Sequence, residues 1–168
     1  DATSLRGAIS TGFHAPTPGQ SNVHNTITTF DSLTGGQLEE RLIPATDSLA
    51  MSLGGQAMQE EKSKNFSFGV TSTVGDYTTI TLDFYKIEVN DRIYRTGNLE
   101  QPDGSSISFF TNALDVEHKG LDLVVLSEFE EISTDISFVY SYTQVDVVKQ
   151  SLVNGKQPIM NETIEDIE

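Results

Sequence analysis

Several stretches of the chain alternate apolar and polar residues, which is the period of a β-strand whose successive side chains point to opposite faces. The clearest of them spans Glu61 to Ile93 and folds back at Gly75-Asp76, a pair that favours a tight turn. One face of this hairpin is small and polar, and the other is apolar. The apolar face carries Phe66, Phe68, Val70, Val74, Ile80, Leu82 and Phe84. A hairpin this long needs a partner sheet or a membrane to cover that face.

The same alternation recurs along the chain, so an all-β fold is expected. The predicted strands cover residues 4–13, 62–74, 77–94, 106–126 and 133–146. In the strand over 77–94 the apolar side chains change from even to odd positions after Phe84. Either a β-bulge or a strand that continues past the apolar layer would cause this change.

The connections between these strands are alternately long and short. Residues 14–60 and 96–105 form the long ones, tight turns form the others, and an acidic tail follows the last strand. The first connection is rich in Gly, Ser, Thr, Asn and Gln, with a short helix expected near Gln37–Leu42. Irregular connections of this length are usually functional or mobile.

The central stretches of the apolar faces carry no charged side chain. A charge there would cost about 2–4 kcal/mol at the middle of a bilayer, so the pattern favours a membrane barrel. Aromatic residues near strand ends suit the aromatic girdles of such a barrel: Phe13, Tyr77, Phe84, Tyr85 and Tyr142. The alternative is a soluble all-β binding module, an adhesin or carbohydrate-binding sandwich that uses residues 14–60 for recognition. The two differ in whether the apolar residues face lipid or lie between two sheets.

Composition argues against several other functions. The net charge of −15 argues against nucleic acid as a partner and against an anionic membrane surface. The chain has no cysteine, and its three histidines lie far apart without metal-ligand spacing, so no metal site is expected. It also has no nucleophile-elbow, phosphate-binding or dinucleotide-binding motif. We therefore expect no catalytic residue and no cofactor, and the acidic tail ETIEDIE lacks the pattern of a calcium loop.

Three stretches resemble, in order and spacing, the TonB-dependent receptors of the Gram-negative outer membrane. LRGAISTGFHAPTPGQ is similar to the family's strand that ends in Gly-Phe-Arg-Ala-Pro, with His14 in place of the arginine. EKSKNFSFGV…LDFYKIEVNDRI is similar to its hairpin that begins Pro-Glu-Lys-Ser/Thr and continues into an aspartate-rich strand. FFTNALDVEHKGLDLVV is similar to its Asn…Lys/Thr-Gly-Val-Glu-Leu strand. The resemblance covers about residues 4–145.

The resemblance implies a fold for the parent protein. In this family a barrel of about 22 strands encloses an N-terminal plug and imports scarce ligands with energy from the inner membrane. Residues 1–168 would form one partial domain, an antiparallel up-and-down meander from the C-terminal half of that barrel. The plug, the TonB-contacting segment and the terminal strand would lie outside it. The start at Asp1, without an initiator Met or a leader, is expected of an internal fragment or a processed product.

The implied function is the binding and import of a scarce nutrient across the outer membrane, foremost a ferric siderophore or another iron complex. The implied partners are that ligand, outer-membrane lipid, and the TonB and plug domain of the full-length parent. No bond would be made or broken. In isolation, so few strands leave open edges, and the piece is expected to oligomerise, pair through its edges or repack.

The resemblance also orients the strands. Residues 14–60, 96–105 and 146–168 would be extracellular, and the two tight turns would be periplasmic. The polar side chains expected to face the lumen are Arg6, Ser10, Thr71, Thr73, Asp83, Asp122, Ser137 and Ser141. The residues expected to contact the ligand, from the loops and the upper lumen, are His14, His24, Tyr94, Arg95 and His118.

Overall fold

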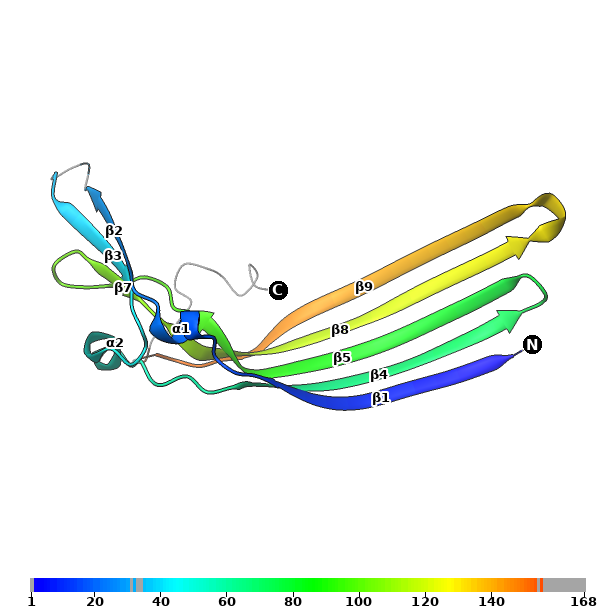
Figure 1. The fold of residues 1–168 in the computed structure, drawn as a ribbon, viewed down its shortest axis with the longest axis horizontal. Helices are drawn as coiled ribbons and strands as arrows, with labels where there is room; N and C mark the ends of the chain where they lie inside the picture. The colour runs from blue at the N-terminus through cyan, green and yellow to red at the C-terminus, as the bar shows by residue number, and fades with distance from the viewer. Residues whose placement is uncertain (1, 31, 33–34, 154, 156–168) are drawn as a thin grey trace. The chain divides into compact units, whose positions relative to one another are not determined.

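The computed structural model describes residues 2–30, 32, 35–153 and 155 (Figure 1). Five long strands form one sheet in the spatial order β1-β4-β5-β8-β9. Their bounds are Thr3–His14 for β1, Glu61–Val74 for β4, Thr78–Arg95 for β5, Phe110–Phe129 for β8 and Thr134–Gln150 for β9. The five predicted strands are confirmed, except that residues 106–108 form a separate short strand ahead of β8. The tail ETIEDIE lies outside the described residues.

Neighbouring strands of this sheet are antiparallel. Near the start of β1 the N–H of Thr73 donates to the carbonyl of Ala2 at 3.0 Å. Farther along, the side-chain amide of Asn65 donates to the hydroxyl of Ser10 at 3.2 Å. Residue numbers therefore rise along β1 as they fall along β4. Together with the strand order, this makes the predicted up-and-down meander.

Two tight turns join the long strands, and both need backbone in the left-handed region. Gly75 has φ +63° between β4 and β5, where the absence of a side chain makes this conformation inexpensive. Between β8 and β9 a single 3₁₀ turn, Glu130–Ile132, is followed by Ser133 at φ 50°. The N–H of Ser133 donates to the carbonyl of Glu130 at 3.1 Å and closes this turn.

The change of apolar parity along β5 comes from the strand continuing past the apolar layer. The hydroxyl groups of Thr81 and Thr71 lie 3.1 Å apart across the hairpin, and Asp83 accepts a hydrogen bond from Arg6 on the same polar face. Lys86 lies three positions after Asp83, so in an unbroken strand its side chain belongs to the opposite face. It pairs there with Glu117, and the alternation is therefore unbroken at this point. The positive φ of β5 falls later, at Asp91 with φ 56°. The second of the two sequence-based explanations is therefore the right one.

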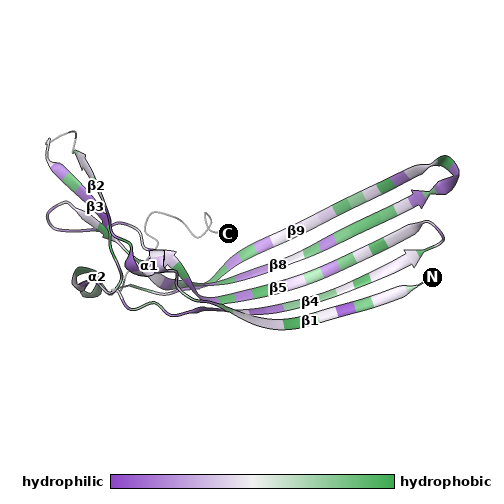
Figure 2. Ribbon diagram, viewed as in Figure 1, coloured by the Kyte–Doolittle hydropathy of each residue, from purple (hydrophilic) through white to green (hydrophobic). Residues whose placement is uncertain are grey.

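Hydrophobic residues recur along the long strands (Figure 2), and many of the large ones are exposed. On β4, Phe66 and Phe68 keep 44% and 48% of their surface, and on β9, Phe138 and Tyr140 keep 55% and 49%. A β-sandwich would bury these side chains between two layers. The sheet therefore presents a broad apolar surface, as a membrane barrel does. None of the described helices is long and apolar enough to cross a membrane.

The long connections fold into a second, smaller sheet. Its order is β2-β3-β7-β6, with β2 antiparallel to β3, β3 parallel to β7 and β7 antiparallel to β6. The bounds are Asn25–Phe30 for β2, Gln37–Leu42 for β3, Leu99–Glu100 for β6 and Ser106–Ser108 for β7. Two short helices precede β2 and follow β3: α1, Pro18–Asn22, and α2, Ser48–Ser52.

The helix predicted near Gln37–Leu42 is wrong, because these residues form strand β3. The segment QLEERL consists of good helix formers, which is what suggested a helix. A helix of six residues is marginal in water, whereas every residue of β3 has a partner on β2, from Leu42 opposite Asn25 to Gln37 opposite Phe30. Strand pairing therefore outweighs local propensity.

The loop segments share a small apolar core, so the first long connection is not irregular. The buried members are Ile43, Ala45, Ala50, Ile107, Phe109 and Val153, with Leu49, Leu53 and Leu99 packed against them. Phe109 is fully buried at its centre. Gly55 closes the segment after α2, and a side chain there would lie 2.6 Å from the carbonyl oxygen of Ala45. These contacts hold residues from both long connections in one folded unit. We call it the loop unit; it comprises the described residues within 13–62, 90–116 and 147–168.

Phe109→Ala in the full-length protein is expected to destabilise this loop unit by about 3–5 kcal/mol, because it empties the centre of a small core. Backbone amides of β3 and α2 should then exchange hydrogen for deuterium much faster, while those of β4 near the Gly75 turn keep their rate. Phe138→Ala, on the exposed face of β9, is the matched control and should leave β3 unchanged. Unchanged exchange of β3 in Phe109→Ala would contradict the role of this core.

Candidate functional site

The polar face of the long-strand sheet carries a bridge across three strands. Arg6 of β1 donates from Nη1 to the hydroxyl of Thr71 on β4 at 2.8 Å and from Nε to the carboxylate of Asp83 on β5 at 2.9 Å. Its Nη2 forms an ion pair with the same carboxylate. Gly69 of β4 leaves room for this reach, because a side chain there would collide with Asp83 and come within 2.8 Å of Arg6 Nε.

A second bridge on β5, β8 and β9 has the same form. The hydroxyl groups of Tyr85 on β5 and Thr143 on β9 lie 2.8 Å apart, and the tyrosine ring passes over Gly120 of β8. Beside it, Ser141 donates to the carboxylate of Asp122 at 2.6 Å. In both bridges a glycine on the middle strand lets a long side chain join the strands on either side. The polar face is thus tied together by side chains as well as by the backbone.

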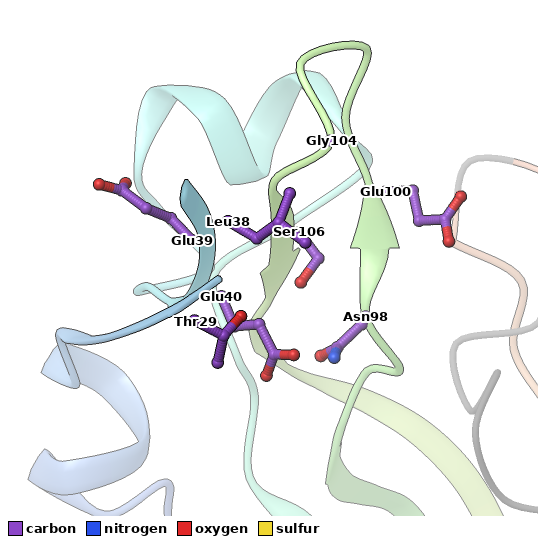
Figure 3. Close-up of a pocket in the computed structure, with 8 residues that line it drawn as sticks. All are labelled: Thr29, Leu38, Glu39, Glu40, Asn98, Glu100, Gly104 and Ser106. Atoms are coloured by element: carbon purple, nitrogen blue, oxygen red, sulfur yellow. The ribbon is translucent and has the colours of Figure 1, made fainter. Parts of the chain in front are cut away.

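The smaller sheet lines an open cavity of about 290 Å³ (Figure 3). Its lining is polar and acidic, with no basic side chain. The lining residues are Thr29, Leu38, Glu39, Glu40, Asn98, Glu100, Gly104 and Ser106. In the close-up, the carboxylate of Glu40 and the amide of Asn98 extend toward the same space.

Strand register explains why two glutamates line this cavity. Glu40 of β3 is the partner of Ser106 on β7, and Ser106 is also the partner of Glu100 on β6. Directly paired residues share a face, so the two glutamates flank one serine in a single row. Within the described part of the chain, neither carboxylate has an ion pair or a side-chain hydrogen bond. The row can accept hydrogen bonds from amine, amide or hydroxyl groups.

The turn between β6 and β7 holds one edge of the cavity in place. Gly104 has φ +83° in this turn, and its N–H donates to the carbonyl of Gln101 at 3.0 Å. The carboxylate of Asp103 accepts the hydroxyl of Ser105 at 2.6 Å and the N–H of Ser105 at 2.9 Å. These two bonds favour the ionised form and lower the pKa of Asp103.

The structure places His14 at the base of the loop segments. Its Nδ1 lies 3.5 Å from the carboxylate of Glu61, at the start of β4. The same carboxylate accepts the N–H of Ile93 on β5 at 2.7 Å. Nearby in the same unit, the side chain of Asn112 bonds to the backbone of Gln59 through both its oxygen, at 2.8 Å, and its nitrogen, at 3.0 Å. His14 therefore belongs to a group of contacts that join the strand ends under the loops.

The other predicted ligand contacts are dispersed. Arg95 donates from Nε to the hydroxyl of Ser108 at 3.0 Å, and Tyr94 precedes it on β5. His24 is exposed between α1 and β2, and His118 is half-buried on β8. None of the five predicted residues lines the 290 Å³ cavity. Their role in binding a ligand stays a prediction.

Sequence reasoning missed the acidic row of the cavity. The sequence has turn-forming residues on either side of β6, Gly97-Asn98 and Pro102-Asp103-Gly104, but isolated glutamates in polar connections are usually solvated. Only the pairing of β3 with β7, which joins distant parts of the chain, brings Glu40 and Glu100 to one place. Among the described residues, no group of three or more histidine, aspartate or glutamate side chains could hold a metal ion.

Comparison with known proteins identifies the family. The family model for the TonB dependent receptor-like β-barrel matches residues 1–161. Among solved structures, the siderophore receptor PirA from Pseudomonas aeruginosa is similar, with a TM-score of 0.62 and 18% sequence identity. The similarity covers 86% of this chain and 26% of that receptor, so the chain spans about a quarter of its length. A search of curated protein sequences found no match. Because the family model covers nearly the whole sequence, the chain belongs to the TonB-dependent receptor-like β-barrel family.

Proposed function

We propose that this chain forms part of the barrel wall and the extracellular loops of a receptor in the outer membrane of a Gram-negative bacterium. The full-length receptor binds and imports a scarce nutrient, and that nutrient is a ferric siderophore or another iron complex. Family membership supports the receptor, and the fold shared with the siderophore receptor PirA supports iron as the cargo. The TonB and plug domain of the parent would supply energy and close the lumen.

The observation that carries this proposal is the contrast between the two faces of the long-strand sheet. The exposed face holds large apolar side chains, for example Ile9 at 83% and Phe13 at 79% exposure on β1. In water such a surface would drive association with other proteins, and in a bilayer acyl chains cover it. The opposite face holds the ion pair of Arg6 and Asp83, which suits a water-filled lumen.

The work of the receptor is binding and gating, without covalent chemistry. The loop unit offers the acidic row of Glu40 and Glu100 as hydrogen-bond acceptors, and the predicted contacts His14, His24, Tyr94 and Arg95 as donors and aromatic surfaces. The fifth predicted contact, His118, lies on β8 of the long-strand sheet. An iron complex carries hydrogen-bonding groups around its metal, and a loop unit with both donors and acceptors can hold it by its outer groups.

The alternative of a soluble binding sandwich is not favoured. It requires Phe66, Phe68, Phe138 and Tyr140 to be buried between two sheets, and all four are exposed.

Growth under iron limitation tests the proposed function. A strain that lacks the full-length receptor, grown on a panel of single iron sources, is expected to lose growth on one iron complex and to recover it with a plasmid-borne copy. Loss of TonB should give the same defect. Normal growth on every iron source, with a defect on cobalamin or an oligosaccharide, would overturn iron as the cargo and leave the import role in place.

A further inference from the structure

Strand β2 differs from the other edge strands because it carries no charged residue. The edges of the two described sheets are β1 and β9 in the larger sheet and β2 and β6 in the smaller one. Arg6 lies on β1, Asp135 on β9 and Glu100 on β6, whereas β2 reads NTITTF. Natural sheets commonly protect an exposed edge from pairing with another chain by a charge or a proline. Among the described edges, only that of β2 has neither.

The outer edge of β2 is accessible, and its residues suit a strand. Each of its six residues pairs with β3 on one side, and no described strand lies on the other side. The backbone N–H and C=O groups of a strand point to both sides, so those on the outer side of β2 lack a strand partner. All six residues are exposed, with Ile27 at 51% and Phe30 at 74%. Threonine, isoleucine and phenylalanine favour strands, so β2 can accept an added strand.

Charge determines which strand fits this edge. The carboxylates of the neighbouring strand, Glu39 and Glu40, lie on β3, one strand behind the edge. Neighbouring strands are about 4.8 Å apart, so a strand added to β2 would lie about 10 Å from β3. That distance exceeds the screening length of about 8 Å at physiological ionic strength, so a basic strand would gain little from these carboxylates. An uncharged strand is therefore the best match.

A second copy of the chain supplies such a strand. Two copies, each with a net charge of −15, repel each other over most of their surfaces. Joined through β2, their β3 strands would be three strand spacings apart, about 14 Å, where this repulsion is screened. The β2 edge is thus where two copies approach with the least repulsion. A twofold axis also lets one strand be its own partner, since the contact is then self-complementary.

We propose that β2 pairs antiparallel with β2 of a second copy of the receptor and joins the two smaller sheets into one continuous sheet. Full overlap of the two strands places the twofold axis between Ile27 and Thr28. Thr26 then lies opposite the partner's Thr29, and two threonines in this position share a hydrogen bond. This dimer goes beyond the proposed function and takes from it only the membrane location. Confinement to one membrane raises the effective concentration of the copies, so an edge of six residues suffices.

Two substitutions of opposite charge test the pairing. Thr28 lies opposite Glu39 of β3, and Thr26 lies opposite Arg41. Thr28→Lys and Thr26→Glu therefore each face an opposite charge inside the hairpin, which should keep its fold. Energy transfer between labelled copies of the full-length receptor in lipid vesicles, over a range of protein-to-lipid ratios, measures their association. Both variants should weaken it at least about tenfold, because the twofold axis applies each new edge charge twice.

The opposite signs separate strand pairing from net charge. If repulsion between acidic chains alone controlled association, Thr28→Lys would strengthen it and Thr26→Glu would weaken it, and that result would overturn the inference. Met51→Lys and Met51→Glu are the matched controls, because Met51 of α2 is 58% exposed in the same unit and lies outside β2. Both control variants should associate like wild type. Wild type that stays monomeric at every protein-to-lipid ratio would also overturn the inference.

Cross-linking in intact cells identifies the occupant of the β2 edge. The chain has no cysteine, so Thr28→Cys introduces one thiol at this edge. A short bismaleimide should then give a product of twice the receptor's mass that contains receptor peptides alone, and Met51→Cys should give none. A link within one receptor, or to a different protein, would overturn the inference. Dimers of a receptor that imports no iron complex would refute the proposed function alone, whereas import by a monomeric receptor would refute the dimer alone.

Discussion

Removal of residues 21–58 from the full-length receptor is expected to abolish ligand binding while the barrel still assembles. The deletion takes away strands β2 and β3, half of the acidic cavity and the core residues Ile43, Ala45 and Ala50. A site built from several loop contacts would lose most of its binding free energy. Loss of about 4 kcal/mol lowers affinity about a thousandfold.

Assembly should survive because strand pairing does not use the deleted segment. The bonds that align β1 with β4 join Ala2 to Thr73 and Ser10 to Asn65, and Arg6 bridges to β5 from the same region. Ligand binding is measured by fluorescence quenching on purified receptor, and assembly by the heat-modifiable migration of the folded barrel. Normal affinity in a correctly assembled deletion would refute the role of the loop unit. Failure to assemble would refute the independence of the strands from it.

A narrower variant separates the acidic cavity from the rest of the loop unit. The double variant Glu40→Gln, Glu100→Gln keeps the strand pairing and removes two charges. Its ligand affinity is therefore measured together with that of the deletion. A ligand held by this row should then bind more weakly while β3 keeps its hydrogen-exchange protection. The comparison shows whether the deletion acts through this cavity or through other loop contacts.

The long strands were predictable because their residues obey one strong local rule. An exposed apolar face needs Phe66, Phe68 and Phe138 at alternate positions, and this period appears in the sequence before any tertiary contact is known. The turn at Gly75 was predictable for a similar reason, because few residues tolerate its positive φ. The change of parity on β5 was visible, and only contacts with neighbouring strands could decide its cause.

The loop unit was much less predictable, because long-range pairing determines it. Strand β3 has a helix-forming sequence and becomes a strand only because β2 and β7 lie on either side of it. Phe109 reads as one more residue of a strand, yet it lies at the centre of a core drawn from both connections. The predicted ligand contacts follow from side-chain chemistry within polar stretches, and that chemistry does not reveal that Glu40 and Glu100 lie in one row. The sequence shows which residue types the loop unit contains, and only the tertiary structure shows where they lie relative to one another.

Replacement of Gly120 by alanine is expected to destabilise the long-strand sheet by about 1–3 kcal/mol through overpacking. The new methyl group would lie 2.7 Å from the carbonyl oxygen of Tyr142 and would collide with the ring of Tyr85. A backbone carbonyl cannot rotate away as the end of a flexible side chain can. Displacement of the ring would also remove the bond between the Tyr85 and Thr143 hydroxyl groups, worth about 1 kcal/mol. Urea unfolding of the full-length receptor in lipid vesicles measures the total loss in the free energy of unfolding.

Gly7→Ala is the matched control, since it makes the same change on β1 of the same sheet. There the nearest atom, the carbonyl oxygen of Ser67, lies 3.5 Å away, an ordinary van der Waals distance. This variant should be neutral or slightly stabilising, because alanine restricts the unfolded chain more than glycine does. Equal stability of the Gly7→Ala and Gly120→Ala variants would contradict the predicted clash, because it would show that β8 can accommodate the added methyl group.

The source of the cost can be resolved by adding Tyr85→Ala. Without the ring, only the clash with the carbonyl of Tyr142 remains, so Gly120→Ala should cost less in this background, by an interaction energy of about 0.5–3 kcal/mol. An unchanged cost would mean that the ring yields freely and that the backbone of β9 alone requires the glycine. A reduced cost would mean that Gly120 is required by the three-strand bridge, which also accounts for a glycine at the equivalent place, Gly69, beneath the bridge from Arg6 to Asp83.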